Sequence, residues 1–187
     1  MGRYLCLTTQ EYKNGDFKLI PLRDEDKYSI MNWRNAQIYH LRQDKLLTKP
    51  DQDAYFSNVV SNIYNQPKPS QILFSYLNRE ECIGYGGLVH INWKDKNAEI
   101  SFIINTELEA EHFEFHWNLY LSLIEVVAFK ELKMHKIFVY AFDLRPQLYS
   151  VLEISGYKQE ARLIDHVIID DKFKDVVIYS KINLIEE

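Results

Sequence analysis

The sequence predicts an α/β fold of the α+β kind, with helices flanking a mixed, mostly antiparallel central sheet. Strand-like and helical segments alternate along the chain, and three consecutive strand-like segments are separated only by short polar turns. The chain has 187 residues, of which 47% are hydrophobic, enough to bury one full core. We therefore expect a single domain over residues 1–187, with about six or seven strands and about four helices.

The first elements are a strand and two helices. The strand is expected at Phe17–Leu22, and the first helix at Glu25–Trp33 with Asp24 as its N-cap. A second helix should begin at Thr48-Lys49-Pro50-Asp51, because proline is favoured in the first helical turn. Apolar residues then recur at helical spacing as far as Ile63.

The middle of the chain predicts an antiparallel meander. Its three strands are rich in β-branched and aromatic residues, and they span Ile72–Leu77, Cys82–Trp93 and Ala98–Asn105. The C-terminal part predicts a long buried helix, a strand, a short helix and a hairpin, at Glu111–Leu132, Lys136–Phe142, Pro146–Ile154, Ala161–Ile169 and Asp175–Ile182. Gly156 should end the short helix.

Composition narrows the function. The formal net charge of −5 offers no general basic surface, so nucleic acid is not expected as a partner. Cys6 and Cys82 are the only thiols, which favours a reducing compartment, the cytoplasm. No apolar run is long enough to cross a membrane, and the N-terminal ten residues lack a cleavable signal.

The turn between the third meander strand and the long helix is unusually acidic. Such turns can bind phosphates when glycines let backbone N–H groups approach the ligand. Here we expect a loop carrying Glu107, Glu109 and Glu111, followed by Glu114. The negative electrostatic field of this loop would repel a pyrophosphate, unless another surface or nearby basic residues attract the phosphates.

Four segments resemble the GNAT superfamily of N-acetyltransferases: FKLIPLRDEDKYSIMNWRN, ECIGYGGLVHIN, AEISFIINTE and VLEISGYKQEARL. With the order of elements they are similar to the branch of ribosomal-protein N-terminal acetyltransferases and amino-sugar N-acetyltransferases. The resemblance implies acetyl transfer from acetyl-coenzyme A to a primary amine. It also implies a fourth strand splayed from the fifth, which admits the pantetheine arm.

Departures from the family pattern concern the cofactor loop and one catalytic tyrosine. Where the family has an Arg or Gln followed by spaced glycines, this chain has Glu109, Ala110, His112 and Glu114, so the pyrophosphate loop is degenerate. An asparagine common before the short helix is replaced by Arg145, which we expect to contact cofactor phosphates.

The chemistry requires a base for the amine, an acid for the departing thiolate and donors for the thioester carbonyl. Glu99 on the fourth family strand is the candidate base, with an exposed structural carboxylate as the alternative. The family's tyrosine position holds a leucine, and Tyr149 one turn earlier is the candidate acid or else a packing residue. Backbone groups of Phe102, Ile103 and Ile104 should align the pantetheine.

The acceptor pocket of this family lies between the first two helices. The matching residues are polar, basic or aromatic: Trp33, Arg34, Asn35, Arg42 and Gln43. Either arginine could bind a phosphate of a nucleotide-linked substrate. An amino sugar is favoured as acceptor, while a protein N-terminus, polyamines and antibiotics stay open.

Parts of the sequence are also compatible with other functions. His112 and His116 share a helical face, but no third ligand is evident, so no metal site is expected. A catalytically silent binding module would explain the degenerate loop. A third class, an assembly protein or homodimer, would use the aromatic residues Phe113, Phe115 and Trp117 as an interface.

Overall fold

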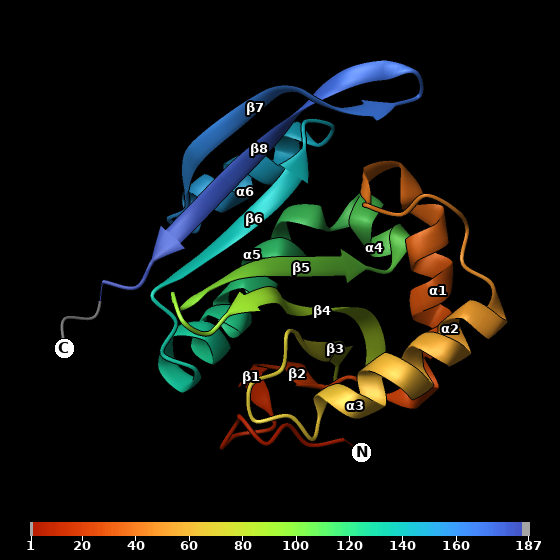
Figure 1. Cartoon of the computed structure of the whole chain (residues 1–187), viewed down its shortest axis with the longest axis vertical. Coiled ribbons are helices and arrows are strands. Elements are labelled where there is room, and N and C mark those ends of the chain that lie inside the picture. Colours follow the sequence, from red (N-terminus) through yellow and green to blue (C-terminus); the bar gives the residue numbers. More distant parts are fainter. Residues whose placement is uncertain (1, 185–187) are drawn as a thin grey trace.

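The computed structural model describes residues 2–184, whose strands form one sheet in the order β1-β2-β3-β4-β5-β6-β8-β7 (Figure 1). The strands are β1 Tyr12–Asn14, β2 Phe17–Pro21, β3 Ile72–Asn78, β4 Glu81–Asn92, β5 Asn97–Ile104, β6 Lys136–Phe142, β7 Lys158–Ile169 and β8 Lys172–Ile182. Among the strands of residues 2–184 only β5 and β6 pair in parallel. The predicted fold class is confirmed. The sheet has eight strands rather than six or seven, because β1 was not predicted.

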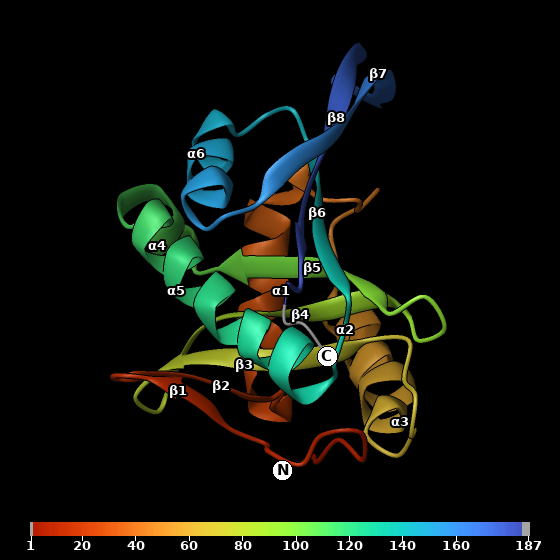
Figure 2. The same cartoon turned by 90° about the vertical axis from the view of Figure 1, so that its left-hand side faces the viewer.

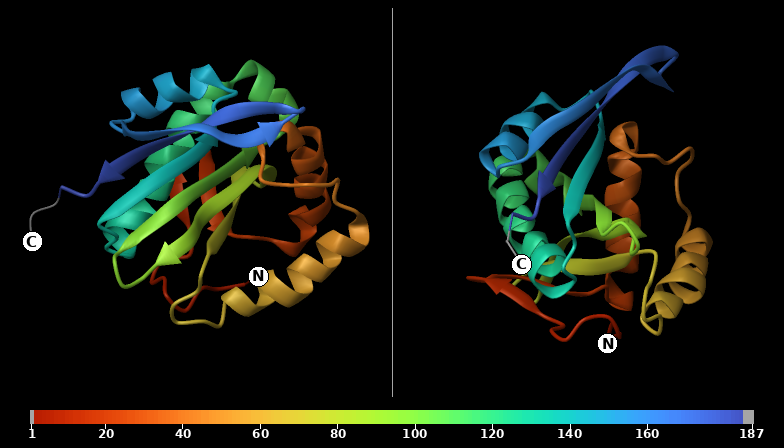
Figure 3. Two further views of the ribbon diagram at one scale, coloured as in Figure 1. Left: turned by 45° about the horizontal axis from the view of Figure 1, so that its top comes forward. Right: turned by 60° about the vertical axis from the view of Figure 1, so that its left-hand side comes forward.

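The helices cover the two faces of the sheet. They are α1 Lys27–Ala36, α2 Lys49–Tyr55, α3 Ser61–Ile63, α4 Thr106–Glu111, α5 Phe113–Glu125 and α6 Pro146–Ile154. α1, α2 and α3 lie on one side, and α5 and α6 lie together on the other (Figures 2 and 3). Within residues 2–184 no helix is long and apolar enough to span a bilayer. Met1 and residues 185–187 of the expected domain fall outside the described residues.

The starts of two helices show where local sequence predicts a helix N-cap correctly and where it does not. Thr48 caps α2 as expected: its side chain accepts the Asp51 N–H, and the Asp51 carboxylate accepts the Thr48 N–H. The prediction for Asp24 was wrong. Asp24–Asp26 form a 3-10 turn before α1, in which the Asp26 carboxylate binds Arg23 and accepts from the Ser75 hydroxyl at 2.6 Å. That contact with β3 is long-range, so local spacing could not reveal it.

The acidic segment also differs from its expected structure. It is the short helix α4 rather than a loop, with the Asn105 side chain accepting the Glu107 N–H at its start. The segment contains no glycine, and carboxylates in a first turn favour a helix through the macrodipole. The following helix begins at Phe113, after a break at His112, and not at Glu111.

A splay between β5 and β6 creates space at one edge of the core. Their pairing covers only Asn97–Glu99 against Lys136–Phe138, and beyond Glu99 the two strands diverge (Figure 3). β4 follows β5 much further, as far as Ile104. The resemblance-based expectation of a splayed strand pair is thereby confirmed, and Glu99 stands where the splay begins.

Candidate active site

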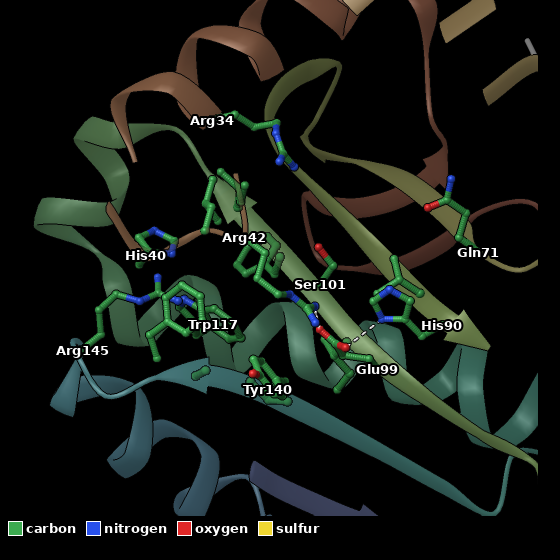
Figure 4. A pocket seen from close by; sticks show the side chains of 18 residues that line it. Arg34, His40, Arg42, Gln71, His90, Glu99, Ser101, Trp117, Tyr140 and Arg145 are labelled. Atoms are coloured by element: carbon green, nitrogen blue, oxygen red, sulfur yellow. Dashed lines mark hydrogen bonds and ion pairs between the residues drawn. The ribbon is translucent and has the colours of Figure 1, made fainter. Parts of the chain in front are cut away.

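A cavity of about 450 Å³ lies between the diverging strands β5 and β6 (Figure 4). The loop after α1, the C-terminal part of β4 and the N-terminal part of α5 complete its walls. Its charged and polar lining residues are Arg34, His40, Arg42, Gln71, His90, Glu99, Ser101, Tyr140 and Arg145. Three guanidinium groups therefore face a cavity whose lining includes one carboxylate.

Glu99 is almost fully buried where the splay begins, with 5% of its surface exposed. One carboxylate oxygen forms an ion pair with Arg42, and the other lies 2.9 Å from His90 Nδ1. The Arg42 guanidinium lies 4.8 Å from the centre of the Tyr140 ring, a cation–π distance. Arg42 therefore reaches from the loop after α1 to both β5 and β6.

Arg34 lines the same cavity from α1. Its Nε donates to Gln43 Oε1 at 2.9 Å, and its Nη1 donates to the Tyr85 hydroxyl at 2.6 Å. These neutral partners leave further guanidinium N–H donors. Among residues 2–184 no carboxylate lies within ion-pair distance of this group, so its charge has no protein counterion.

Arg145 stands before α6, at the end of the cavity away from His90 (Figure 4). Its Nη1 donates to Glu109 Oε1 at 2.9 Å, and both side chains are nearly buried. The guanidinium also lies 5.8 Å from the ring centres of Phe113 and Trp117. Burial raises the pKa of Glu109 against the opposing effect of Arg145. One glutamate of the acidic segment is thus already paired by an arginine.

His40 lies near Arg145 and is held neutral. Burial, followed by the positive charge of Arg145, lowers the pKa of His40 to about 3. Its Nε2 is 3.3 Å from Gln37 Oε1, and Gln37 Nε2 donates to the Ile104 carbonyl at 2.7 Å. A neutral imidazole that donates from Nε2 satisfies this chain of hydrogen bonds.

The backbone of β5 offers polar groups to the cavity. The Asn105 N–H donates to the Ile83 carbonyl on β4, which sets the hydrogen-bonded register of this antiparallel pair. By strand alternation Ile103 also bonds towards β4, whereas Phe102 and Ile104 direct their N–H and C=O groups towards the β6 side. Of the three predicted cofactor-binding residues, Phe102 and Ile103 line the cavity. Only Phe102 combines this position with backbone groups directed towards β6, because the Ile104 carbonyl accepts from Gln37 Nε2.

Several predicted site residues lie outside the cavity lining. Asn35 and Gln43 support the loop before α2: Asn35 binds both the N–H and C=O of Leu47, and Gln43 donates to Asn35. Trp33 packs against the core. Tyr149 stacks on Tyr179 and donates its hydroxyl to Asp143 at 2.5 Å. Burial raises the Tyr149 pKa above its usual value.

Sequence reasoning missed several cavity residues, among them His40, His90 and Tyr140. The sequence carried a weak signal for His90, since it sits in a strand adjacent to the one bearing Glu99. His40 ends a short 3-10 helix, Ile38–His40, and Tyr140 lies in an ordinary alternating strand, so neither had a distinguishing pattern. Their shared location depends on strands and loops that meet only in the folded chain.

The residues considered for a metal site or an interface are mostly structural. His116 is buried with Nδ1 3.1 Å from the Tyr76 hydroxyl, and no metal-binding cluster of His, Cys, Asp or Glu occurs in residues 2–184. Phe113 and Trp117 belong to the core, whereas Phe115 is 55% exposed. The expected aromatic interface is thus reduced to one exposed ring on α5.

Comparisons with known proteins agree with the fold. A family model described as "Acetyltransferase (GNAT) domain" matches residues 19–178. The spermidine N-acetyltransferase of Vibrio cholerae, solved with coenzyme A and spermine, is 20% identical with a TM-score of 0.77, covering 91% of this chain and 97% of that one. A dodecameric structure of the Vibrio cholerae enzyme has a TM-score of 0.74 at 20% identity, with 91% and 95% covered. No curated protein matches this sequence.

Proposed function

The chain belongs to the GNAT acetyltransferase family, and from that premise we propose that it acetylates a small primary amine that also carries an anionic group. Acetyl-coenzyme A is the acetyl donor of this family. An amino sugar linked to a phosphate is the acceptor we favour. A protein N-terminus flanked by acidic residues is the next candidate for the same cavity.

The cavity fits one part of the donor better than another. The diverging strands expose backbone groups of Phe102 on the β6 side, which suits the amide-bearing pantetheine arm. The phosphate end meets helix α4 instead of a glycine-rich loop. Arg145 supports phosphate binding here, because it lines the cavity and is paired by only one carboxylate, Glu109.

The main support for an anionic acceptor is the positive charge of Arg34, which has no carboxylate partner within residues 2–184. A guanidinium in a cavity wall without a carboxylate partner in the described chain favours an anionic ligand, because burial of an unpaired charge is costly. Arg42 adds a second cation near Glu99. A carboxylate or phosphate on the acceptor would bind Arg34 while its amine is directed to Glu99.

We assign Glu99 as the base that takes a proton from the acceptor ammonium. Its burial at the start of the splay places it beside the open part of the cleft. For the proton that the departing thiolate needs, Tyr140 is our candidate in preference to Tyr149. Tyr140 lines the cavity, whereas the Tyr149 hydroxyl is directed to Asp143.

Polyamines are disfavoured by this charge distribution, although the structural relatives include a spermidine N-acetyltransferase. At 20% identity, that structural similarity supports a shared fold but does not identify the substrate. A polycation would meet three arginines, while the carboxylate of Glu99 is already paired with Arg42.

We also propose a single cytoplasmic domain that forms a homodimer, to be tested by its mass in solution.

The proposal is tested by an acceptor screen that detects free coenzyme A thiol. Phosphorylated or nucleotide-linked amino sugars, acidic peptides and spermidine are compared at equal concentration. We expect Arg34→Gln to raise KM for the anionic acceptor by about 10- to 100-fold, the loss of one charge-assisted contact. Arg34→Lys, which keeps the charge, should lose less. Preference for spermidine over every anionic amine would refute the acceptor class.

Binding of the donor is measured separately by titration with coenzyme A. Micromolar binding without turnover of any amine would favour the catalytically silent binding module over the enzyme. Absence of binding, together with an unchanged melting temperature at millimolar ligand, would contradict use of acetyl-coenzyme A by this chain.

A further inference from the structure

We propose that His90 is a proton-relay residue, which carries the acceptor's proton from Glu99 to solvent. This inference rests on the proposed acetyl transfer and extends it to a residue outside the predicted site. Glu99 is buried, so a proton that it accepts needs a route out of the cavity. His90 Nδ1 lies 2.9 Å from Glu99 Oε2, and the other end of the ring reaches solvent.

The exposure of the two side chains differs sharply. The side chain of Glu99 is 7% exposed and that of His90 is 65% exposed. A histidine that touches a buried carboxylate with one nitrogen while its ring meets water connects the two environments. In Figure 4 the dashed contact from His90 to Glu99 lies at the opposite end of the cavity from Arg145.

The backbone of β4 is distorted at this residue. The register of β4 against β5 shifts between Val89 and Asn92, and His90 has a φ of 49° in the left-handed region. In a regular ladder Val89 is the direct partner of Glu99. The irregularity brings the next residue, a histidine, to the carboxylate, as bulges do when they redirect a side chain.

The proton balance of acetyl transfer requires such a route. The acceptor ammonium forms one N–C bond to the acetyl carbon while the thioester C–S bond breaks. Of the two protons that the nitrogen loses, one ends on the coenzyme A thiol and the other is released to water. In our proposal the released proton moves to Glu99 and then to His90 Nδ1, and the exposed imidazolium loses its Nε2 proton to water. Exchange with solvent then restores the original tautomer.

The charged surroundings favour onward transfer from Glu99. Its second oxygen is paired with Arg42, and a carboxyl group that kept the proton would lose that ion pair. The groups around the relay are Glu99 on β5, Arg42 on the loop after α1, and Tyr140 on β6. Among these, His90 is the one whose side chain both contacts the Glu99 carboxylate and is largely exposed to solvent.

Two substitutions separate relay from positioning. Asparagine tolerates left-handed backbone and can still donate a hydrogen bond to Glu99, but it cannot carry a proton. His90→Asn should therefore reduce kcat by about 10²-fold with little change in KM, within the range of a proton-transfer group. The acidic limb of the kcat pH profile should change, because one proton-carrying group is lost while Glu99 remains. His90→Gly leaves room for imidazole, and added imidazole should restore its rate. His135→Asn, at an exposed turn, is the matched control.

Wild-type turnover is measured first, so failure of the proposed function is seen directly as absence of acetylation. If the wild type is active and His90→Asn keeps its kcat and pH profile, the relay is refuted. A readout independent of turnover uses ¹⁵N NMR of the His90 ring. Glu99→Gln should shift the titration curve of that ring in the free protein, and an unchanged curve would remove the coupling on which the relay depends.

Discussion

His40 makes folding stability depend on pH in a way that can be worked out from its surroundings. Burial and the Arg145 cation lower its pKa to about 3, against an ordinary value of about 6.5 in the unfolded chain. The unfolded state therefore binds one more proton between these values, so the stabilisation present above pH 6.5 is lost as the pH falls towards 3. Between pH 7 and pH 5 this single group should account for about 2 kcal/mol.

The test compares urea unfolding of the wild type and His40→Gln at pH 7 and pH 5. Glutamine keeps an amide donor for Gln37 but does not titrate. The wild type should lose about 2 kcal/mol more than the variant on acidification, or roughly 4–8 °C in Tm for a chain of this size. His116, whose pKa burial lowers to about 4, is present in both proteins and cancels.

An exposed histidine supplies the control. His135→Gln should leave the wild-type difference between the two pH values intact. If wild type and His40→Gln lose equal stability on going to pH 5, His40 is not held neutral by its burial. The hydrogen-bond chain through Gln37 would then have to be reassigned, because it requires the neutral ring.

Three further predictions concern the cavity. Glu99→Gln should lower kcat by about 10²- to 10⁴-fold while coenzyme A binding, measured by titration, stays the same; an active variant would exclude Glu99 as base. Glu109→Gln should free the Arg145 guanidinium and tighten coenzyme A binding. The double variant Arg145→Met/Glu109→Met removes both charges, so that no unpaired charge stays buried, and it should weaken coenzyme A binding by about 10- to 100-fold. Equal affinities would remove Arg145 from the phosphate site. Tyr140→Phe should depress kcat more than Tyr149→Phe in the same thiol-release assay, and the reverse order would restore Tyr149 as the acid.

The sequence could predict those residues of the candidate site whose role depends on their residue type and on their position in a strand or loop. Glu99 was identified from its place on the strand expected to splay, and Arg34, Arg42 and Arg145 from positions that match the family's pockets. Their partners were not predictable. The ion pair between Arg145 and Glu109 joins segments 36 residues apart, and the contact of Arg42 with Glu99 spans 57.

Apart from β1 and α4, the sequence alone determined the order of strands and helices, because apolar periodicity, the Thr48 cap and the Gly156 stop are local properties of a few neighbouring residues. Only the tertiary structure decided that β5 and β6 part at Glu99 and that His90 meets the carboxylate there. Those contacts follow from the register between strands and from a local distortion of β4. Such long-range packing has no signature at a fixed sequence spacing. The fold of a chain can therefore be predicted from its sequence more readily than the contacts within its active site.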